Sequence, residues 1–247
     1  MRVALFATCL ADQLFPEVAV AAVRLLRTLG VNPDFPEAQT CCGQPAYNAG
    51  YHRETERLAE HHLEVFAGYD YVVLPSGSCG AMVKTHYPEL LRESPERYRE
   101  ARDLAERSYE LTTFITEVLG RTAIGADLAG TRVLYHDSCH ALRFMGVRDA
   151  PRRLLHAAGA ELLEPPDAEV CCGFGGLFSV KMPDISAAMA QSRLPGIAAS
   201  GADVLASTDG GCLMQLRGAL NRAGNPIAVK HVAELLWEGV ARQRVGA

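Results

Sequence analysis

Short apolar runs alternate with longer amphipathic segments along the first half of this chain. Residues 3–7 form an apolar run, and residues 16–29 carry apolar side chains at helical spacing until a glycine ends the pattern. Residues 54–66 predict a second helix, and residues 69–74 predict a buried strand that ends in the turn 75–80. The first half is therefore expected to contain two strands with helices between them.

The second half repeats this order with its own segments. It predicts a strand at 133–136, a helix at 151–158 and a strand at 204–207. The first half also contains the extra segment 96–120, which predicts one solvated helix that continues into a packed one. Strands that alternate with helices predict an α/β fold with two pseudo-symmetric halves, each a mainly parallel sheet flanked by helices.

The cysteines occur twice in the same pattern. In both halves a lone cysteine is followed 32 positions later by a Cys-Cys-Gly tripeptide, and a last cysteine comes 37 positions after the pair in the first half and 40 in the second. Residues 2–9 also align with residues 132–139 without gaps. A repeat of half the chain indicates two related domains, which we place at 1–125 and 126–247. The two sets are Cys9, Cys41, Cys42 and Cys79, and Cys139, Cys171, Cys172 and Cys212.

The first and last cysteine of each set come shortly after a predicted strand. In parallel α/β sheets, ligands bind beyond the carboxyl ends of the strands, so each set is expected to converge there. Helices are predicted to begin directly after these loops, and the dipole at a helix N-terminus favours the thiolate over the thiol. Each half is thus expected to carry one cysteine site at the C-terminal ends of its strands.

Composition and charge exclude several classes of function. The chain has 247 residues, of which 49% are hydrophobic, and a formal net charge of −5. That charge gives no general attraction to nucleic acid, and no apolar run reaches the roughly 18 residues of a membrane-spanning helix. The N-terminal apolar run is too short for a signal peptide, so a soluble cytoplasmic protein is expected. In that reducing compartment, eight cysteines favour metal or redox chemistry over a disulfide framework.

Four thiolates fill the coordination shell of a zinc ion or of a cubane iron–sulfur cluster. Zinc sites usually take their ligands from two close C-x2-4-C pairs, and the cysteines here are spaced differently. A Cys-Cys-Gly turn presents two sulfurs together, and its glycine lets the backbone approach a bulky inorganic core. A 4Fe-4S cluster in one or both halves is therefore predicted, with zinc possible at one site. The structural alternative is that these cysteines are buried thiols without a ligand.

The histidines give a weaker signal than the cysteines. His140 adjoins Cys139 and could donate a hydrogen bond to a cluster sulfur. His136 is predicted to end a strand, and His61 and His62 to lie on a polar, solvated face of a helix. None of these three is given a functional role, and no catalytic residue is assigned.

The motifs resemble those of a known family. The order C…CCG…C, twice in one chain, is similar to the cysteine-rich CCG domain that occurs in heterodisulfide reductase and in the iron–sulfur subunits of glycolate oxidase and anaerobic glycerol-3-phosphate dehydrogenase. In size and motif wording the chain is similar to the lactate-utilisation protein A family. The likeness covers nearly the whole chain and rests on segments 8–10, 135–140, 171–176 and 211–214.

The resemblance implies an iron–sulfur electron-transfer subunit of an oxidoreductase system that oxidises a 2-hydroxyacid, with L-lactate converted to pyruvate. It implies a non-autonomous subunit whose partners are other oxidoreductase subunits, among them a ferredoxin-like iron–sulfur protein. The sequence has no flavin or nicotinamide fingerprint, so hydride removal is expected elsewhere or at a cluster. Two alternatives are a thiol–disulfide reductase subunit like that of heterodisulfide reductase and a non-redox zinc-binding assembly module.

The chain departs from the family motif at one position in each half. The fuller motif ends in C-x-x-C, whereas Ser76 stands three residues before Cys79 and Asp209 stands three residues before Cys212. Each half thus has four cysteines instead of five, which argues against a five-thiolate, non-cubane cluster. Oxygen ligation by Ser76 or Asp209 is the alternative that this departure leaves open.

Overall fold

The first half is built on a three-stranded sheet in the order β1-β2-β3. The computed structural model describes residues 1–165 and 167–245. The strands are β1 (Val3–Leu5), β2 (Tyr71–Leu74) and β3 (Ser108–Glu110). The helices are α1 (Cys9–Leu14), α2 (Pro16–Thr28), α3 (Gln44–Asn48), α4 (His52–Val65), α5 (Gly77–Ala81), α6 (Tyr87–Leu90), α7 (Pro95–Glu106) and α8 (Leu111–Thr113), with π-helical turns η1 (Met82–His86) and η2 (Phe114–Val118).

The second half is built on a four-stranded sheet in the order β5-β4-β6-β7. Its strands are β4 (Arg132–Tyr135), β5 (Glu161–Leu163), β6 (Val204–Ser207) and β7 (Ala228–His231). Its helices are α9 (Cys139–Met145), α10 (Asp149–Ala157), α11 (Leu177–Lys181), α12 (Pro183–Ala199), α13 (Gly210–Arg222) and α14 (Val232–Val245).

The two sheets have equivalent topology. All neighbouring strands in both sheets pair in parallel, and β1, β2 and β3 occupy the places that β4, β6 and β7 occupy in the second half. A parallel bridge between Ala4 and Asp34 takes the place of β5 in the first half. The predicted α/β fold, with two pseudo-symmetric halves and mainly parallel sheets, is confirmed.

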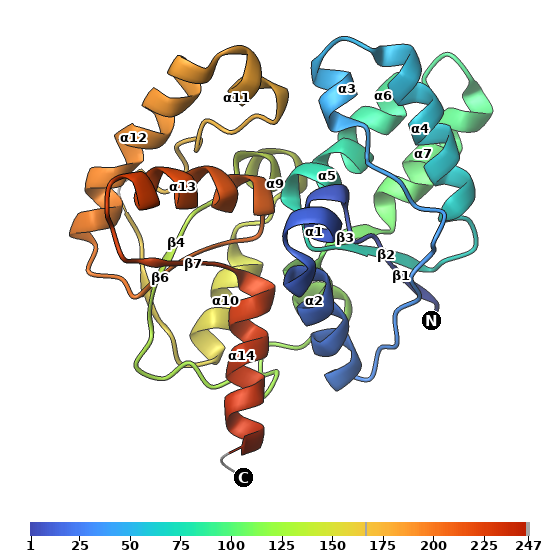
Figure 1. The fold of residues 1–247 in the computed structure, drawn as a ribbon. Coiled ribbons are helices and arrows are strands. Elements are labelled where there is room, and N and C mark those ends of the chain that lie inside the picture. The colour runs from blue at the N-terminus through green and yellow to red at the C-terminus, as the bar shows by residue number, and fades with distance from the viewer. Residues whose placement is uncertain (166, 246–247) are drawn as a thin grey trace.

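The largest hydrophobic cluster is shared by both halves. It contains Val3 and Leu5 of β1 together with Val133 and Tyr135 of β4, all of them buried. Helix α2 packs against α14 (Figure 1), and α10 packs against α8, so each half places a helix against the other. Burial of one such aliphatic side chain contributes about 1.5–3 kcal/mol, so this cluster holds the two proposed domains together. The two smaller clusters each belong to one half.

One segment of the first half differs from its prediction. Residues 96–120 were expected to form one helix that continues from a solvated into a packed part, but the structure ends α7 at Glu106 and places strand β3 at Ser108–Glu110. Val72 and Leu74 of β2 pair with Ser108 and Glu110, which are fully buried. Pairing with a neighbouring strand satisfies the buried backbone groups, and this tertiary contact outweighs the local helical preference. Strands β5 and β7 were likewise not predicted, because their sequences, Glu-Leu-Leu and Ala-Val-Lys-His, include charged or polar residues and lack the longer apolar run that marked the other strands.

The helices are short. Helix α12, at 17 residues, is the longest in the part of the chain that the structure describes. Within residues 1–165 and 167–245, no helix is both long and apolar enough to cross a bilayer.

Candidate metal centre

Four of the eight cysteines lie in the first turn of a helix. Cys9 and Cys139 are the first residues of α1 and α9, which follow β1 and β4. Cys79 and Cys212 are the third residues of α5 and α13, which follow β2 and β6. Because the N-terminal end of a helix carries the positive end of its dipole, each of these sulfurs lies near a partial positive charge. These four cysteines therefore lie at the C-terminal ends of the strands.

The four sulfurs of the first set lie next to one another. Cys9 Sγ is 3.5 Å from Cys41 Sγ, and Cys42 Sγ is 3.4 Å from Cys79 Sγ. Hydrogen bonds donated by Cys42 and Cys9 lower the pKa of Cys41 to about 2. Hydrogen bonds to Cys41 and Cys79, together with burial, raise the pKa of Cys42 well above its usual value. Metal ligands must be deprotonated, so the remaining thiols of this set would release their protons when the set binds a metal.

The second set repeats this arrangement. Cys139 Sγ is 3.8 Å from Cys171 Sγ. Hydrogen bonds donated by Cys139 and Cys172 lower the pKa of Cys171 to about 2, and the contacts of Cys172 with Cys171 and Cys212 raise the pKa of Cys172. The backbone N–H of Gly173 also donates to Cys171 Sγ at 3.4 Å. Each half thus brings four sulfurs together in the same order along the chain.

The glycine of each Cys-Cys-Gly turn is required by its backbone and by its neighbours. Gly43 has a φ of 84° and Gly173 a φ of 85°, in the left-handed region that side chains other than glycine rarely adopt. A Cβ at position 43 would lie 2.9 Å from Thr55 Cγ2, and one at position 173 would lie 2.7 Å from Ser186 O. The turn therefore fixes the direction of two sulfurs in each half.

The two sets face one shared cavity. Helices α5 and α9, which carry Cys79 and Cys139, pack so closely that a Cβ at Gly77 would lie 2.4 Å from Ala141 Cβ. Helices α1, α5 and α9 lie between the two halves in Figure 1. The cavity enclosed there has a volume of about 160 Å³. All eight cysteines line it, with Leu10, Gln44, Pro45, Ser78, Ser138, His140, Phe174, Gly175, Gly176 and Asp209.

Ser76 and Asp209 cap helices and contact each other. Ser76 Oγ accepts a hydrogen bond from the backbone N–H of Cys79, and Asp209 Oδ1 accepts from the backbone N–H of Cys212 and, at 3.0 Å, of Gly211. Ser76 Oγ also donates to Asp209 Oδ2 at 3.4 Å. Ser and Asp are preferred at the N-cap because their oxygens accept from unpaired backbone donors. This capping role explains the two residues that stand where the fuller motif has cysteine.

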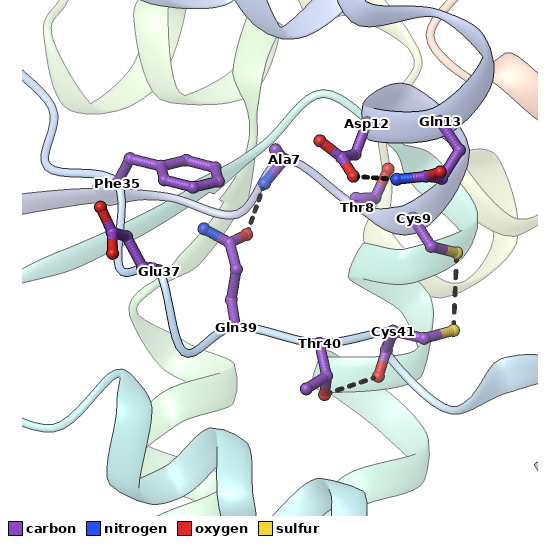
Figure 2. A pocket seen from close by; sticks show the side chains of 10 residues that line it. All are labelled: Ala7, Thr8, Cys9, Asp12, Gln13, Phe35, Glu37, Gln39, Thr40 and Cys41. Carbon is purple, nitrogen blue, oxygen red and sulfur yellow. Dashed lines mark hydrogen bonds between the residues drawn. The ribbon is translucent and has the colours of Figure 1, made fainter.

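A second cavity, of about 350 Å³, reaches the first set from another side (Figure 2). Figure 2 shows the sulfurs of Cys9 and Cys41 facing each other at its edge. Gln39 is fixed there, because its Oε1 accepts from the backbone N–H of Ala7 at 2.9 Å. Thr8, which precedes Cys9, has a φ of 61°, which is rare for a β-branched residue. Cys9 and Cys41 line this cavity and are only partly buried.

The prediction for His62 was wrong. Its side chain is fully buried rather than solvated, and it stacks edge-on against Phe6. Its Nε2 accepts from the backbone N–H of Thr40 at 3.3 Å, so its Nδ1 donates to Tyr87 Oη at 2.6 Å. Tyr87 Oη in turn donates to the carbonyl of Cys42 at 2.9 Å. Burial lowers the pKa of His62 to about 4, and this neutral ring supports the Cys-Cys-Gly turn from behind.

Two histidines lie close to the second cysteine set. His140 Nδ1 is 3.6 Å from Cys139 Sγ, so its position fits the predicted contact with a sulfur. His136, which received no role, is buried, and one of its nitrogens lies within 4.8 Å of the sulfurs of Cys172 and Cys212. Burial lowers the pKa of His136 to about 4. In the sequence, the one sign of a role for His136 is that this polar residue occupies the position at which the first half has Phe6.

Comparisons with known proteins show what this chain is similar to. The CCG family, described as a cysteine-rich domain, matches residues 3–84 and 133–217. Similar curated proteins include three named lactate utilization protein A: 51% identity in Geobacillus kaustophilus and 49% in Geobacillus thermodenitrificans, each over 96% of this chain and 98% of the relative, and 47% in an Exiguobacterium strain, over 97% and 98%. Among solved structures, a glutamate racemase from Thermus thermophilus aligns with 99% of this chain and 80% of its own, at 15% identity and a TM-score of 0.35.

Proposed function

This chain belongs to the cysteine-rich CCG domain family, and on that premise we propose that it is an iron–sulfur electron-transfer subunit of a system that oxidises L-lactate to pyruvate. The observation that carries the proposal is the pair of matched sulfur sets, each of four cysteines, around one cavity. Four thiolates at neighbouring positions are the donor set of a 4Fe-4S cluster. The named role of the relatives in lactate utilization supports the substrate.

The residues of each half suit a thiolate-bound group. Cys9, Cys41, Cys42 and Cys79 would hold one cluster, and Cys139, Cys171, Cys172 and Cys212 the other. A bound 4Fe-4S cluster supplies the transfer of single electrons. The protein keeps the first and last sulfur of each set at a helix N-terminus, where negative charge is stabilised. The backbone N–H of Gly173, which donates a hydrogen bond to Cys171 Sγ, likewise stabilises negative charge on that sulfur.

The proposal makes this chain one member of a complex. Lactate oxidation removes two electrons and two protons, and the sequence has no flavin or nicotinamide fingerprint to accept a hydride, so a second redox subunit completes the reaction. A ferredoxin-like iron–sulfur protein is the partner that we propose, and the cytoplasm is the proposed location. The isolated chain is then an electron carrier without lactate dehydrogenase activity of its own.

Anaerobic purification tests the cofactor. We expect a brown protein that contains iron and acid-labile sulfide and whose visible absorption bleaches when dithionite reduces it. A colourless protein with stoichiometric zinc, and without iron even after reconstitution, would instead favour the zinc-binding assembly module.

An activity assay tests the subunit role. Purified chain given L-lactate and an artificial electron acceptor is expected to show no turnover, and turnover should begin when the partner subunits are added. Robust lactate oxidation by the single chain would overturn the subunit part of the proposal and leave the cofactor part untouched.

The shared cavity supports a second candidate, thiol–disulfide reduction. Because both cysteine sets line it, two single-electron sites would face one small compartment. A disulfide bound there would accept two electrons and two protons and leave as two thiols. Stoichiometric release of thiols from a small-molecule disulfide by the dithionite-reduced protein, with excess dithionite removed, would favour this candidate over the electron-carrier role.

A further inference from the structure

His136 is a buried side chain without a hydrogen-bond partner. It is 1% exposed, and neither Nδ1 nor Nε2 has a partner among the described residues. A buried polar group left unsatisfied costs about 1–3 kcal/mol. An unsatisfied buried group calls for an explanation, and a bound ion is one, so the neighbours of His136 must be considered.

Two sulfur atoms lie beside the ring of His136. One ring nitrogen, Cys172 Sγ and Cys212 Sγ all lie within 4.8 Å of one another, and all three residues are buried. Bonds of about 2.0–2.3 Å to one metal place two ligands no more than about 4.5 Å apart, so the three atoms need only small shifts to share a metal. Imidazole nitrogen binds both iron and zinc.

The first half provides an internal comparison. Phe6 and His136 are equivalent, because the backbone N–H of Phe6 donates to Val73 O and that of His136 to Ala206 O, both at 2.9 Å on matching strands. The first cysteine set therefore has an apolar ring where the second has an imidazole. The one buried imidazole near the first set, His62, has partners for both ring nitrogens. Among the buried histidines of residues 1–165 and 167–245, His136 is the one whose two ring nitrogens both lack a partner.

We propose that His136 is a nitrogen ligand of the metal group held by the second cysteine set. The two sites then differ in chemistry: the first half offers four sulfurs, and the second offers four sulfurs and one nitrogen for the four ligand positions of a cubane cluster or a zinc ion, so the nitrogen would take one of those positions. This inference rests on the proposed function in one respect, namely that the second set holds a metal. It adds that the two halves are not interchangeable copies, because a neutral nitrogen brings no charge to the site whereas each thiolate brings one.

Pulsed electron paramagnetic resonance tests the ligand directly. Protein labelled with ¹⁵N-histidine is loaded anaerobically with iron and sulfide and reduced, in a Cys42→Ser background that removes the first site. We expect a strong hyperfine coupling to one histidine nitrogen. It should be absent from His136→Phe, which copies the residue of the first half. It should persist in His140→Ala, the matched control for the other nearby imidazole.

Each outcome decides the proposal. A reduced cluster without histidine coupling, or with coupling that His136→Phe leaves unchanged, overturns it. If His136→Phe does not fold, the ¹⁵N-labelled protein is compared with and without His140→Ala. A coupling that persists in His140→Ala is then assigned to His136, and a coupling that disappears is assigned to His140. If no iron cluster forms, the proposed function fails separately, and X-ray absorption of the zinc-loaded Cys42→Ser protein takes over. A Zn–N distance of about 2.0–2.1 Å beside Zn–S distances of about 2.3 Å, retained in His140→Ala, then supports His136 ligation, and a shell of sulfur alone overturns it.

Discussion

The carboxylate of Asp209 accepts a hydrogen bond from the backbone N–H of Ser78 at 2.7 Å, although 131 residues separate the two. The same side chain caps α13 through Gly211 and Cys212. One carboxylate thus fixes the last cysteine of the second set and, at the same time, the helix that carries Cys79. The geometry of the shared cavity depends on this contact.

Asp209→Asn is expected to lower the free energy of unfolding by about 1–3 kcal/mol, because an amide nitrogen then faces buried N–H donors. Urea denaturation of the metal-free protein measures this. Asp203→Asn is the matched control, since Asp203 pairs with Arg132 on the exposed surface, where an ion pair contributes little. Equal losses in the two variants would contradict a special role for Asp209.

Gly77→Ala is expected to disrupt the contact between α5 and α9, since its Cβ would lie 2.4 Å from Ala141 Cβ. Overpacking of this kind typically costs about 1–3 kcal/mol. Adding Ala141→Gly should recover part of the loss, so the double variant should be more stable than the sum of the single effects predicts. Gly218→Ala is the control: its Cβ would meet only Arg222 Nη1, at 3.9 Å, and a more stable helix is expected.

Glu110→Gln is expected to change how stability depends on pH. Burial raises the pKa of Glu110 to about 7, above the unfolded value of 4.5. The stabilisation that this group contributes is therefore fully present below pH 4.5 and is lost as the pH rises through 7. The shift corresponds to a loss of about 3 kcal/mol in the wild type between pH 5 and pH 9, which Glu110→Gln should not show.

Denaturation curves of wild type and Glu110→Gln at several pH values measure this difference. The glutamine retains an oxygen for the backbone N–H groups of Thr112 and Thr113, so the helix cap is preserved. Glu117→Gln, on an exposed side chain, removes the same charge and should follow the wild type. Parallel curves for wild type and Glu110→Gln would show that the carboxyl group is ionised in the folded protein.

Cys42→Ser and Cys172→Ser are each expected to retain about half of the wild-type iron, because a hydroxyl is a poor substitute for a soft thiolate and each variant damages one site. The double variant should contain almost none. Iron analysis after anaerobic purification measures this, and Ser138→Ala, which changes the cavity lining without removing sulfur, should keep its full content. Loss of all iron in either single variant would show that the two sets hold one shared group.

Local sequence determined the features that need only neighbours along the chain. Strands at 71–74 and 204–207 and helices such as α2 follow from apolar spacing, and the paired Cys-Cys-Gly turns require glycine at positive φ wherever they occur. The period of the cysteines also indicated the duplicated fold. These features are fixed by backbone sterics and by the burial pattern of single elements, both of which are readable from residue order.

Only the tertiary structure decided which groups meet. That both cysteine sets line one cavity depends on the close approach of Gly77 to Ala141, which no spacing in the sequence encodes. The predicted solvated position of His62 failed because Tyr87, 25 residues away, supplies a buried partner for its ring. His136 became notable because its buried nitrogens lack such a partner. Burial and hydrogen bonding between distant segments are properties of the packed chain, so residue identity alone could not assign these roles.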